Sequence, residues 1–137
     1  MNPKAVISET VQIDLEPDGD RRWHEVCNVD QLEHGRGIAV LVEGRPVALF
    51  RFSVGDTESL HAVGHIDPRT GTPTIARGLI GSTADEPIVI SPLLKDRFSL
   101  ITGRCLTNDD LSLEIFEARN DGEVVSLRRN VTGEKHV

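Results

Sequence analysis

The feature that most constrains the fold of this chain is a series of short apolar segments, each bounded by turn-forming residues. Residues 37–42 and 46–52 are two such segments, and the Glu43-Gly44-Arg45 sequence between them is typical of a β-hairpin. Asp121-Gly122 marks a second tight turn. About eight segments at this spacing predict an all-β antiparallel sandwich or partly open barrel. The expected strands are residues 23–26, 37–42, 46–52, 61–63, 86–90, 97–101, 111–117 and 124–128.

Helical signals in this chain are few. Asn28 can act as an N-cap, Gln31 follows it at the spacing of a capping box, and Gly35 can end the turn. By contrast, residues 111–117 alternate apolar with polar or charged side chains, which predicts a half-buried strand. The fold should therefore contain at most one or two short helical turns.

The length of 137 residues favours a single globular domain. Residues 10–15 alternate and could form an edge strand, but Pro17-Asp18-Gly19-Asp20 separates them from the rest of the chain. We therefore expect an N-terminal arm over residues 1–20, a globular domain over 21–128 and a frayed C-terminal tail over 129–137.

Composition narrows the possible partners and compartments. Hydrophobic residues make up 38% of the chain and aromatic residues only 4%, so the core should be aliphatic, which suits strands. The formal net charge of −7, without a run of Lys or Arg, argues against binding to nucleic acid. No apolar segment has the length of a membrane span or a targeting sequence, so we expect a cytoplasmic protein without a membrane partner.

The two cysteines, Cys27 and Cys105, provide no disulfide framework. His24 lies three residues before Cys27, but residues three apart on a strand point to opposite faces, so the two are not expected to bind a metal together. Both thiols are expected to be buried or half-buried structural groups.

Nucleophilic and phosphate-binding motifs are also missing from the sequence. Ser91 precedes a proline and lacks the Gly-x-Ser-x-Gly elbow, although pairing with His61 or His65 across loops stays open. Residues 77–81 contain two glycines but lack the Lys-Ser/Thr ending of a phosphate loop. These glycines are expected to serve turns or the close approach of strands. The sequence therefore predicts no catalytic residue.

Two turn-rich segments, Asp67-Pro68-Arg69 and Ser91-Pro92-Leu93-Leu94, are followed by Phe98 and then Thr102-Gly103. In order and spacing they resemble the cluster loops of the Rieske iron–sulfur domain, over residues from about 23 to 125. A Rieske 2Fe–2S centre takes two thiolates and two imidazoles. At the corresponding positions this chain has Asp67 and Ser91 in place of the thiolates, and Arg69 and Leu94 in place of the imidazoles. The resemblance therefore implies a Rieske-like fold that binds no metal or other cofactor.

Four stretches resemble, more closely, the small subunit of assimilatory NAD(P)H-dependent nitrite reductase. They are residues 65–68, 76–81, 91–100 and 102–106. The resemblance implies a large-subunit partner that carries siroheme, a 4Fe–4S cluster, FAD and the NAD(P)H site, and that reduces nitrite to ammonium in nitrate assimilation. It implies that this chain is an accessory subunit of that oxidoreductase, with no catalytic centre of its own.

Without iron, weaker contacts must hold residues 67–70 against residues 91–97. Asp67 can accept hydrogen bonds from backbone N–H groups or from Arg69, Lys95 or Arg97. Ser91 can donate and accept, and Leu94 can fill apolar space. Because these loops combine charge with rigid prolines and no catalytic arrangement, we expect them to form a docking face for the large subunit. The candidate docking residues are Asp67, Pro68, Arg69, Lys95, Asp96 and Arg97.

Two alternative functions remain open from the sequence. The chain could be a Rieske-type 2Fe–2S ferredoxin component of an oxygenase, which would contain iron when purified. It could also be a non-enzymatic β-sandwich binding module for a small molecule or peptide, which would not bind a siroheme flavoprotein.

Overall fold

A computed structural model of the chain describes residues 22–54, 56–83 and 86–130. The expected arm over residues 1–20, with its possible edge strand at 10–15, lies outside the described residues, as do residues 131–137 of the expected tail. No helix in the described part of the chain has the length and apolar character needed to cross a membrane.

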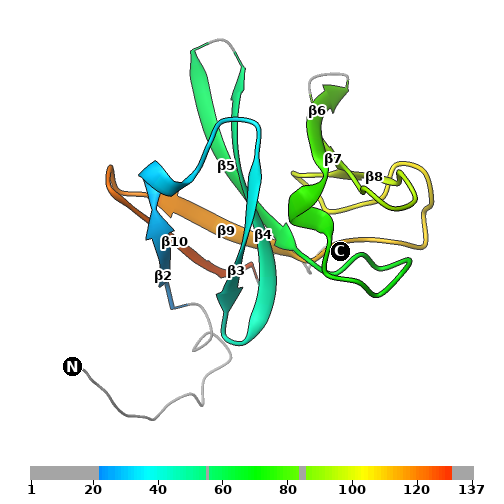
Figure 1. The fold of residues 1–137 in the computed structure, drawn as a ribbon, viewed down its shortest axis with the longest axis horizontal. Helices are drawn as coiled ribbons and strands as arrows, with labels where there is room; N and C mark the ends of the chain where they lie inside the picture. Colours follow the sequence, from blue (N-terminus) through cyan, green and yellow to red (C-terminus); the bar gives the residue numbers. More distant parts are fainter. Residues whose placement is uncertain (1–21, 55, 84–85, 131–137) are drawn as a thin grey trace.

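Two antiparallel sheets form the molecule, and the all-β prediction is confirmed (Figure 1). The larger sheet has six strands in the order β2-β10-β9-β5-β4-β3, and the smaller has three in the order β6-β7-β8. The six strands of the larger sheet are β2 (His24–Asn28), β3 (Gly37–Val42), β4 (Arg45–Val54), β5 (Thr57–Gly64), β9 (Ile115–Asn120) and β10 (Val124–Arg129). The smaller sheet consists of β6 (Leu79–Thr83), β7 (Glu86–Ile90) and β8 (Arg97–Ser99). Two single 3₁₀ turns, η3 (Val29–Gln31) and η4 (Ile75–Arg77), are the only helical elements among the described residues.

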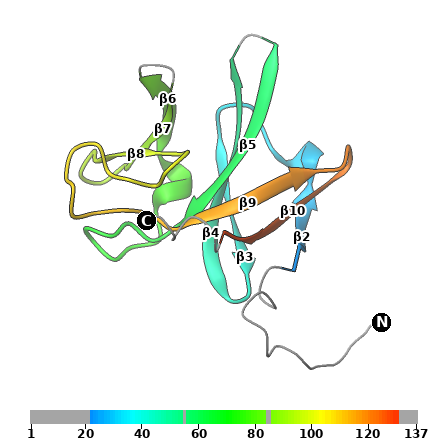
Figure 2. The ribbon, with the colours of Figure 1, turned by 180° about the vertical axis from the view of Figure 1, so that it is seen from behind.

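The larger sheet curls until its two end strands, β2 and β3, contact each other, which gives the expected partly open barrel. The His24 ring at the start of β2 lies 3.0 Å from the carboxylate of Glu43, just after β3. Figure 2 shows the smaller sheet standing beside this barrel, next to β4 and β5. The connection after β5 and the loops around β8 therefore project from the same side of the molecule.

Tight turns close the predicted hairpins. Val42 pairs with Arg45, so the β3–β4 loop contains only Glu43 and Gly44, both with positive φ (53° and 79°). Positive φ at both central positions matches the type I′ turn that suits the twist of a hairpin. Between β9 and β10, Gly122 has a φ of 103°. Both hairpin predictions are confirmed.

Strand β4 supplies both hydrophobic cores because its apolar residues face alternate sides. Ala48 and Phe50 pack into a core shared with Val89 and Phe98 of the smaller sheet. Val47 and Leu49 point the other way, into the interior of the curled sheet. All four β4 side chains are fully buried. The smaller sheet, which carries one of the loops of interest, is thus fixed to the barrel by an apolar core.

Several element boundaries differ from the prediction. The helical turn after Asn28 stops at Gln31 instead of Gly35, although the Asn28 N–H does donate to Gln31 Oε1 at 2.8 Å. Strand β6 was not predicted, because Gly78 and Gly81 gave residues 77–81 the character of a turn. Gly78 does serve close approach, since a Cβ there would lie 2.3 Å from the Ile90 carbonyl oxygen.

The expected strand over residues 111–117 begins only at Ile115. The preceding residues fold against the turn before them: the Cys105 N–H donates to the Leu111 carbonyl at 3.1 Å, and the Leu113 N–H donates to the Gly103 carbonyl at 2.7 Å. These contacts occupy the backbone of 111–113 and explain why its alternating pattern does not extend β9.

Candidate functional site

The first loop of interest follows β5 and is closed by its own backbone. The Asp67 N–H donates to the Thr72 carbonyl at 2.8 Å, and the Gly71 N–H donates to the Asp67 carbonyl at 2.7 Å. Gly71 has a φ of 78°, which a residue without a Cβ adopts readily. This tight turn directs the Asp67 side chain inward, where it is fully buried.

The second loop joins β7 to β8 and is also a compact turn. The Ser91 N–H donates to the Asp96 carbonyl at 2.8 Å, and the Lys95 N–H donates to the Ser91 carbonyl at 3.1 Å. Lys95 has a φ of 64°, which is uncommon for a residue with a side chain. Ser91 is fully buried at the base of the turn.

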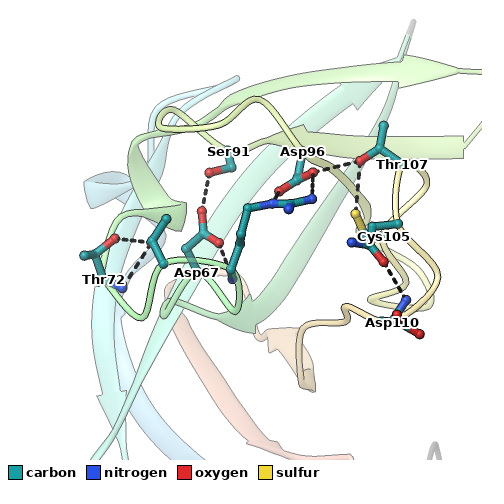
Figure 3. Close-up of polar contacts among 10 residues, drawn as sticks. Asp67, Thr72, Ser91, Asp96, Cys105, Thr107 and Asp110 are labelled. Atoms are coloured by element: carbon teal, nitrogen blue, oxygen red, sulfur yellow. Dashed lines mark hydrogen bonds and ion pairs between the residues drawn. The ribbon is translucent and has the colours of Figure 1, made fainter.

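A short hydrogen bond joins the bases of the two loops (Figure 3). The Ser91 hydroxyl donates to Asp67 Oδ2 at 2.5 Å, and the other carboxylate oxygen of Asp67 accepts from the Arg69 N–H at 2.8 Å. Both oxygens of this buried carboxylate therefore have a donor. The expectation that the Asp67 and Ser91 turns lie together is confirmed.

Asp96 makes a second connection, between three loops. Its carboxylate, 5% exposed, accepts two hydrogen bonds from the Arg69 guanidinium, at 2.6 and 2.9 Å. The Thr107 hydroxyl, in a third loop over residues 102–114, donates to Asp96 Oδ1 at 3.0 Å. Arg69 foremost, with a contribution from Thr107, holds the pKa of Asp96 below its ordinary range. Asp96 thus stays ionised and ties the three loops together.

This second connection was not predicted from the sequence. Arg69 was a candidate partner of Asp67, but only its backbone N–H bonds to Asp67, and its side chain reaches Asp96. Leu94 was expected to fill apolar space, but it is 55% exposed. Arg69 and Asp96 are 27 residues apart, and no local pattern signals their contact.

The four residues that the resemblance places at cluster-ligand positions do not fit a 2Fe–2S cluster. Asp67 and Ser91 are bonded to each other, Arg69 is paired with Asp96, and Leu94 has no donor atom. The cysteines lie elsewhere: Cys27 is on β2 and half-buried, and burial raises the pKa of its thiol. Cys105 is buried in the third loop, with its sulfur 3.1 Å from the Thr107 hydroxyl. Among the described residues no group of three His, Cys, Asp or Glu could hold a metal ion.

The histidines near the loops have structural partners. His65 is buried, and its Nδ1 accepts the Ala76 N–H at 3.1 Å, which fixes the start of η4. Burial, with the nearby charge of Arg77, lowers the pKa of His65. Burial likewise lowers the pKa of His61, whose ring lies 3.0 Å from the Ser59 hydroxyl. Because the Ser91 hydroxyl donates to Asp67, a Ser91–His pair is not formed.

The six candidate docking residues divide into two groups by exposure. Asp67 and Asp96 are buried and hold the loops in place. The other candidates, Pro68, Arg69, Lys95 and Arg97, are exposed at the loop surface. The structure therefore brings all six together, but only four of them are accessible to a partner.

Comparison with known proteins identifies a Rieske-like family and relatives that share this fold. Residues 22–128 match the family described as Rieske-like [2Fe-2S] domain. The NADH nitrite reductase small subunit of Salmonella typhimurium is 36% identical over 107 residues, which cover 78% of this chain and 97% of that protein. The solution structure of the Escherichia coli protein NirD superposes with a TM-score of 0.70 at 34% identity, covering 78% of this chain and 96% of that one.

One further relative is much longer than this chain. The large subunit of the NAD(P)H nitrite reductase of Klebsiella oxytoca is 37% identical over 84 residues, which are 61% of this chain and only 8% of that protein.

Fold and loops together define a Rieske-like domain whose loops are joined by the Asp67–Ser91 hydrogen bond and the Arg69–Asp96 ion pair. Within that class, the chain belongs to the family of nitrite reductase small subunits.

Proposed function

We propose that this chain is the accessory small subunit of an NAD(P)H-dependent nitrite reductase, and that it supplies no catalytic centre itself. The observation that carries this proposal is the 36% identity to a nitrite reductase small subunit over nearly the whole of that protein. The loops that bear a cluster in other Rieske domains are here joined by side chains, so electron transfer through them has no carrier.

The proposed partner is the large subunit of the same enzyme. The Klebsiella oxytoca large subunit contains a stretch that matches this chain, so in that protein the two kinds of sequence are covalently joined. A separate chain would need a non-covalent interface to reach the same arrangement. Siroheme, the 4Fe–4S cluster, FAD and NAD(P)H are proposed to reside on the large subunit, where nitrite would be reduced to ammonium. Both subunits would act in the cytoplasm, where NAD(P)H is available.

Docking is proposed to use the loop face that contains the exposed residues Pro68, Arg69, Lys95 and Arg97. Asp67 and Asp96 would contribute indirectly, since they hold the loops that present these residues. Exposed charges chiefly affect association rate and specificity. Reversal of charge at Lys95 and Arg97 together should therefore reduce co-purification with the large subunit, most clearly at low salt.

Co-expression with a large subunit tests the proposal directly. We expect the two chains to co-purify, and nitrite-dependent oxidation of NAD(P)H to be higher with this chain than without it. Large subunit alone and this chain alone serve as controls, and this chain alone should show no activity. Failure to co-purify, together with equal activity in its presence and absence, would refute the proposed function.

A further inference from the structure

Several large apolar side chains are exposed on the loops that Asp96 ties together, namely Ile66, Ile101 and three leucines. Leu93, Leu94 and Leu106 are 48%, 55% and 46% exposed. Leu93 and Leu94 lie at the tip of the second loop, and Leu106 lies in the third. Exposed leucines are common singly, but exposed apolar residues that gather on one face indicate an interaction site.

Backbone contacts bring the third loop against the second. The Leu106 N–H donates to the Arg97 carbonyl at 2.6 Å, and Phe98 forms a bridge with Cys105. One residue further on, the Thr107 hydroxyl bonds to Asp96. Leu106 is therefore held beside the strand that leaves the turn of Leu93 and Leu94. We call Leu93, Leu94 and Leu106 the leucine face.

Two positive charges are exposed beside the leucine face, although the chain as a whole carries −7 and Asp109 and Asp110 are exposed further along the third loop. Lys95 and Arg97 are both exposed. The neighbouring carboxylates, Asp67 and Asp96, are buried and already hydrogen-bonded. Within residues 22–54, 56–83 and 86–130, no acidic side chain pairs with Lys95 or Arg97; the Lys95 ammonium donates to the Pro92 carbonyl at 3.3 Å. These cations are available to a partner.

The face is also held in one shape before any partner arrives. The second loop is closed by two backbone hydrogen bonds to Ser91 and is fixed to the first loop by Asp67 and Arg69. Binding to such a surface costs less conformational entropy than binding that must first order a loop.

We propose that the leucine face, bordered by Lys95 and Arg97, is the surface that contacts the large subunit. The receiving surface on the large subunit would be apolar at its centre and would carry carboxylates at its rim. This inference rests on the proposed function, which makes the large subunit the partner. A protein partner is favoured over a lipid surface because the Klebsiella oxytoca relative joins this kind of sequence to a large subunit in one chain.

Binding of the intact chain to purified large subunit tests this surface. Leu94→Asp and Leu106→Asp should each weaken the Kd by roughly tenfold or more, as expected for truncation or charging of a central apolar contact. Leu41→Asp on β3 is the matched control, because this leucine is 67% exposed on the end strand of the larger sheet, whereas the leucine face lies on the loops around β8. The control should change the Kd less than twofold. Unchanged thermal unfolding of all three variants checks that each is folded.

The outcomes separate the two proposals. If the wild-type chain does not bind the large subunit at all, the proposed function fails. If the wild-type chain binds and the Leu94 and Leu106 variants bind as tightly as the Leu41 control, the leucine face is wrong while the proposed function stands. Binding of the wild-type chain to vesicles of anionic phospholipid, lost in the same two variants, would overturn the assignment of this face to the large subunit.

Discussion

At the level of single residues, the strongest constraint on the two loops is the buried contact of Asp67 with Ser91. A carboxylate removed from water is costly unless donors satisfy its oxygens. Asp67 has the Arg69 N–H on one oxygen and the Ser91 hydroxyl on the other. Each donor therefore matters more than a surface hydrogen bond would.

Ser91→Ala should lower the free energy of unfolding by about 1–3 kcal/mol, because it leaves one oxygen of a buried carboxylate without its donor. Urea denaturation measures the change. Ser82→Ala is the matched control, since Ser82 is an exposed serine on β6 and should change stability by less than about 0.5 kcal/mol. Equal stability of the two variants would mean that the Asp67–Ser91 bond does not hold the loops.

Stability should also fall as the pH drops below about 6.5. Burial lowers the pKa of His65 and His61 in the folded protein, while the ordinary value of 6.5 applies when the chain is unfolded. The unfolded chain then binds protons more readily, so stability is complete above pH 6.5 and declines as the pH falls toward the folded-state values. A further loss should begin below about pH 3.8, as Asp96 takes up its proton and releases Arg69.

Unfolding free energies measured from pH 8 to pH 5 check the histidine effect. His65→Gln should flatten the decline, even if the variant is less stable at pH 8. His34→Gln is the control, because His34 is exposed and bonds to Ser53 and Glu58 at the surface, and this variant should keep the decline between pH 8 and pH 5. A wild-type stability that is constant between pH 8 and pH 5 would contradict the prediction.

The residue contacts differ in how far the sequence could predict them. The contact of Asp67 with Ser91 could be predicted, because the order and spacing of the two turn-rich segments in the sequence resemble those of Rieske domains. The contact of Arg69 with Asp96 depends on the three-dimensional path of both loops, which places the guanidinium beside Asp96 and not beside Asp67. Thr107 adds a third loop to that contact, and the sequence of this loop contains no motif that indicates it.

At the level of elements, Gly103 controls how the third loop leaves β8. Its φ is 81°, and a Cβ at this position would lie 2.2 Å from the Leu113 carbonyl oxygen. The same residue donates its N–H to the Ser99 carbonyl at 2.9 Å and accepts from Leu113. The turn therefore requires both the backbone freedom and the small size of glycine.

Gly103→Ala should destabilise the protein by about 2 kcal/mol or more, because it combines strain at positive φ with a backbone clash. Thermal or urea unfolding provides the measurement. Gly81→Ala on β6 is the control: nothing lies within 4 Å of a Cβ there, so the change should be small. A Gly103→Ala variant as stable as Gly81→Ala would show that the third loop can be rebuilt without cost.

The elements that sequence reasoning found are those whose signals are local. The Glu43-Gly44 and Asp121-Gly122 turns specify their hairpins within a few residues, and β3 and β7 begin and end where expected. The misplaced start of β9 and the missed strand β6 depend on distant partners instead. The backbone of residues 111–113 is hydrogen-bonded to Gly103 and Cys105 of the same loop, and β6 exists only because β7 pairs with it.

At the scale of the whole molecule, the loops and the barrel are connected by an apolar core and by side-chain hydrogen bonds. The core that includes Phe50 and Phe98 joins the smaller sheet to β4, and the hydrogen bonds of Asp67 and Asp96 join the loops at its edge. The resemblance of its loops to those of Rieske domains predicted this arrangement well. What it could not provide was the contact of Arg69 with Asp96 and Thr107, because Asp96 and Thr107 lie outside the four ligand positions.

Exposure of the purified protein to iron and sulfide under reducing conditions should leave it without a stoichiometric cluster, and a chelator should not change its thermal unfolding. The reason is that the four ligand positions offer no thiolate and no imidazole. Iron analysis and a visible absorption spectrum provide the measurements, with a cluster-bearing Rieske ferredoxin as the positive control. Two irons per chain with a charge-transfer spectrum would contradict the prediction.

The hydrogen bonds of Arg69 and Thr107 to Asp96 have a consequence for how the protein matures. An iron–sulfur cluster can link two loops only after iron and sulfide have been inserted, and oxygen can degrade it. A guanidinium–carboxylate ion pair requires neither insertion nor protection from oxygen, because both side chains belong to the polypeptide. The three loops can therefore close as soon as the chain folds, without iron and in the presence of oxygen.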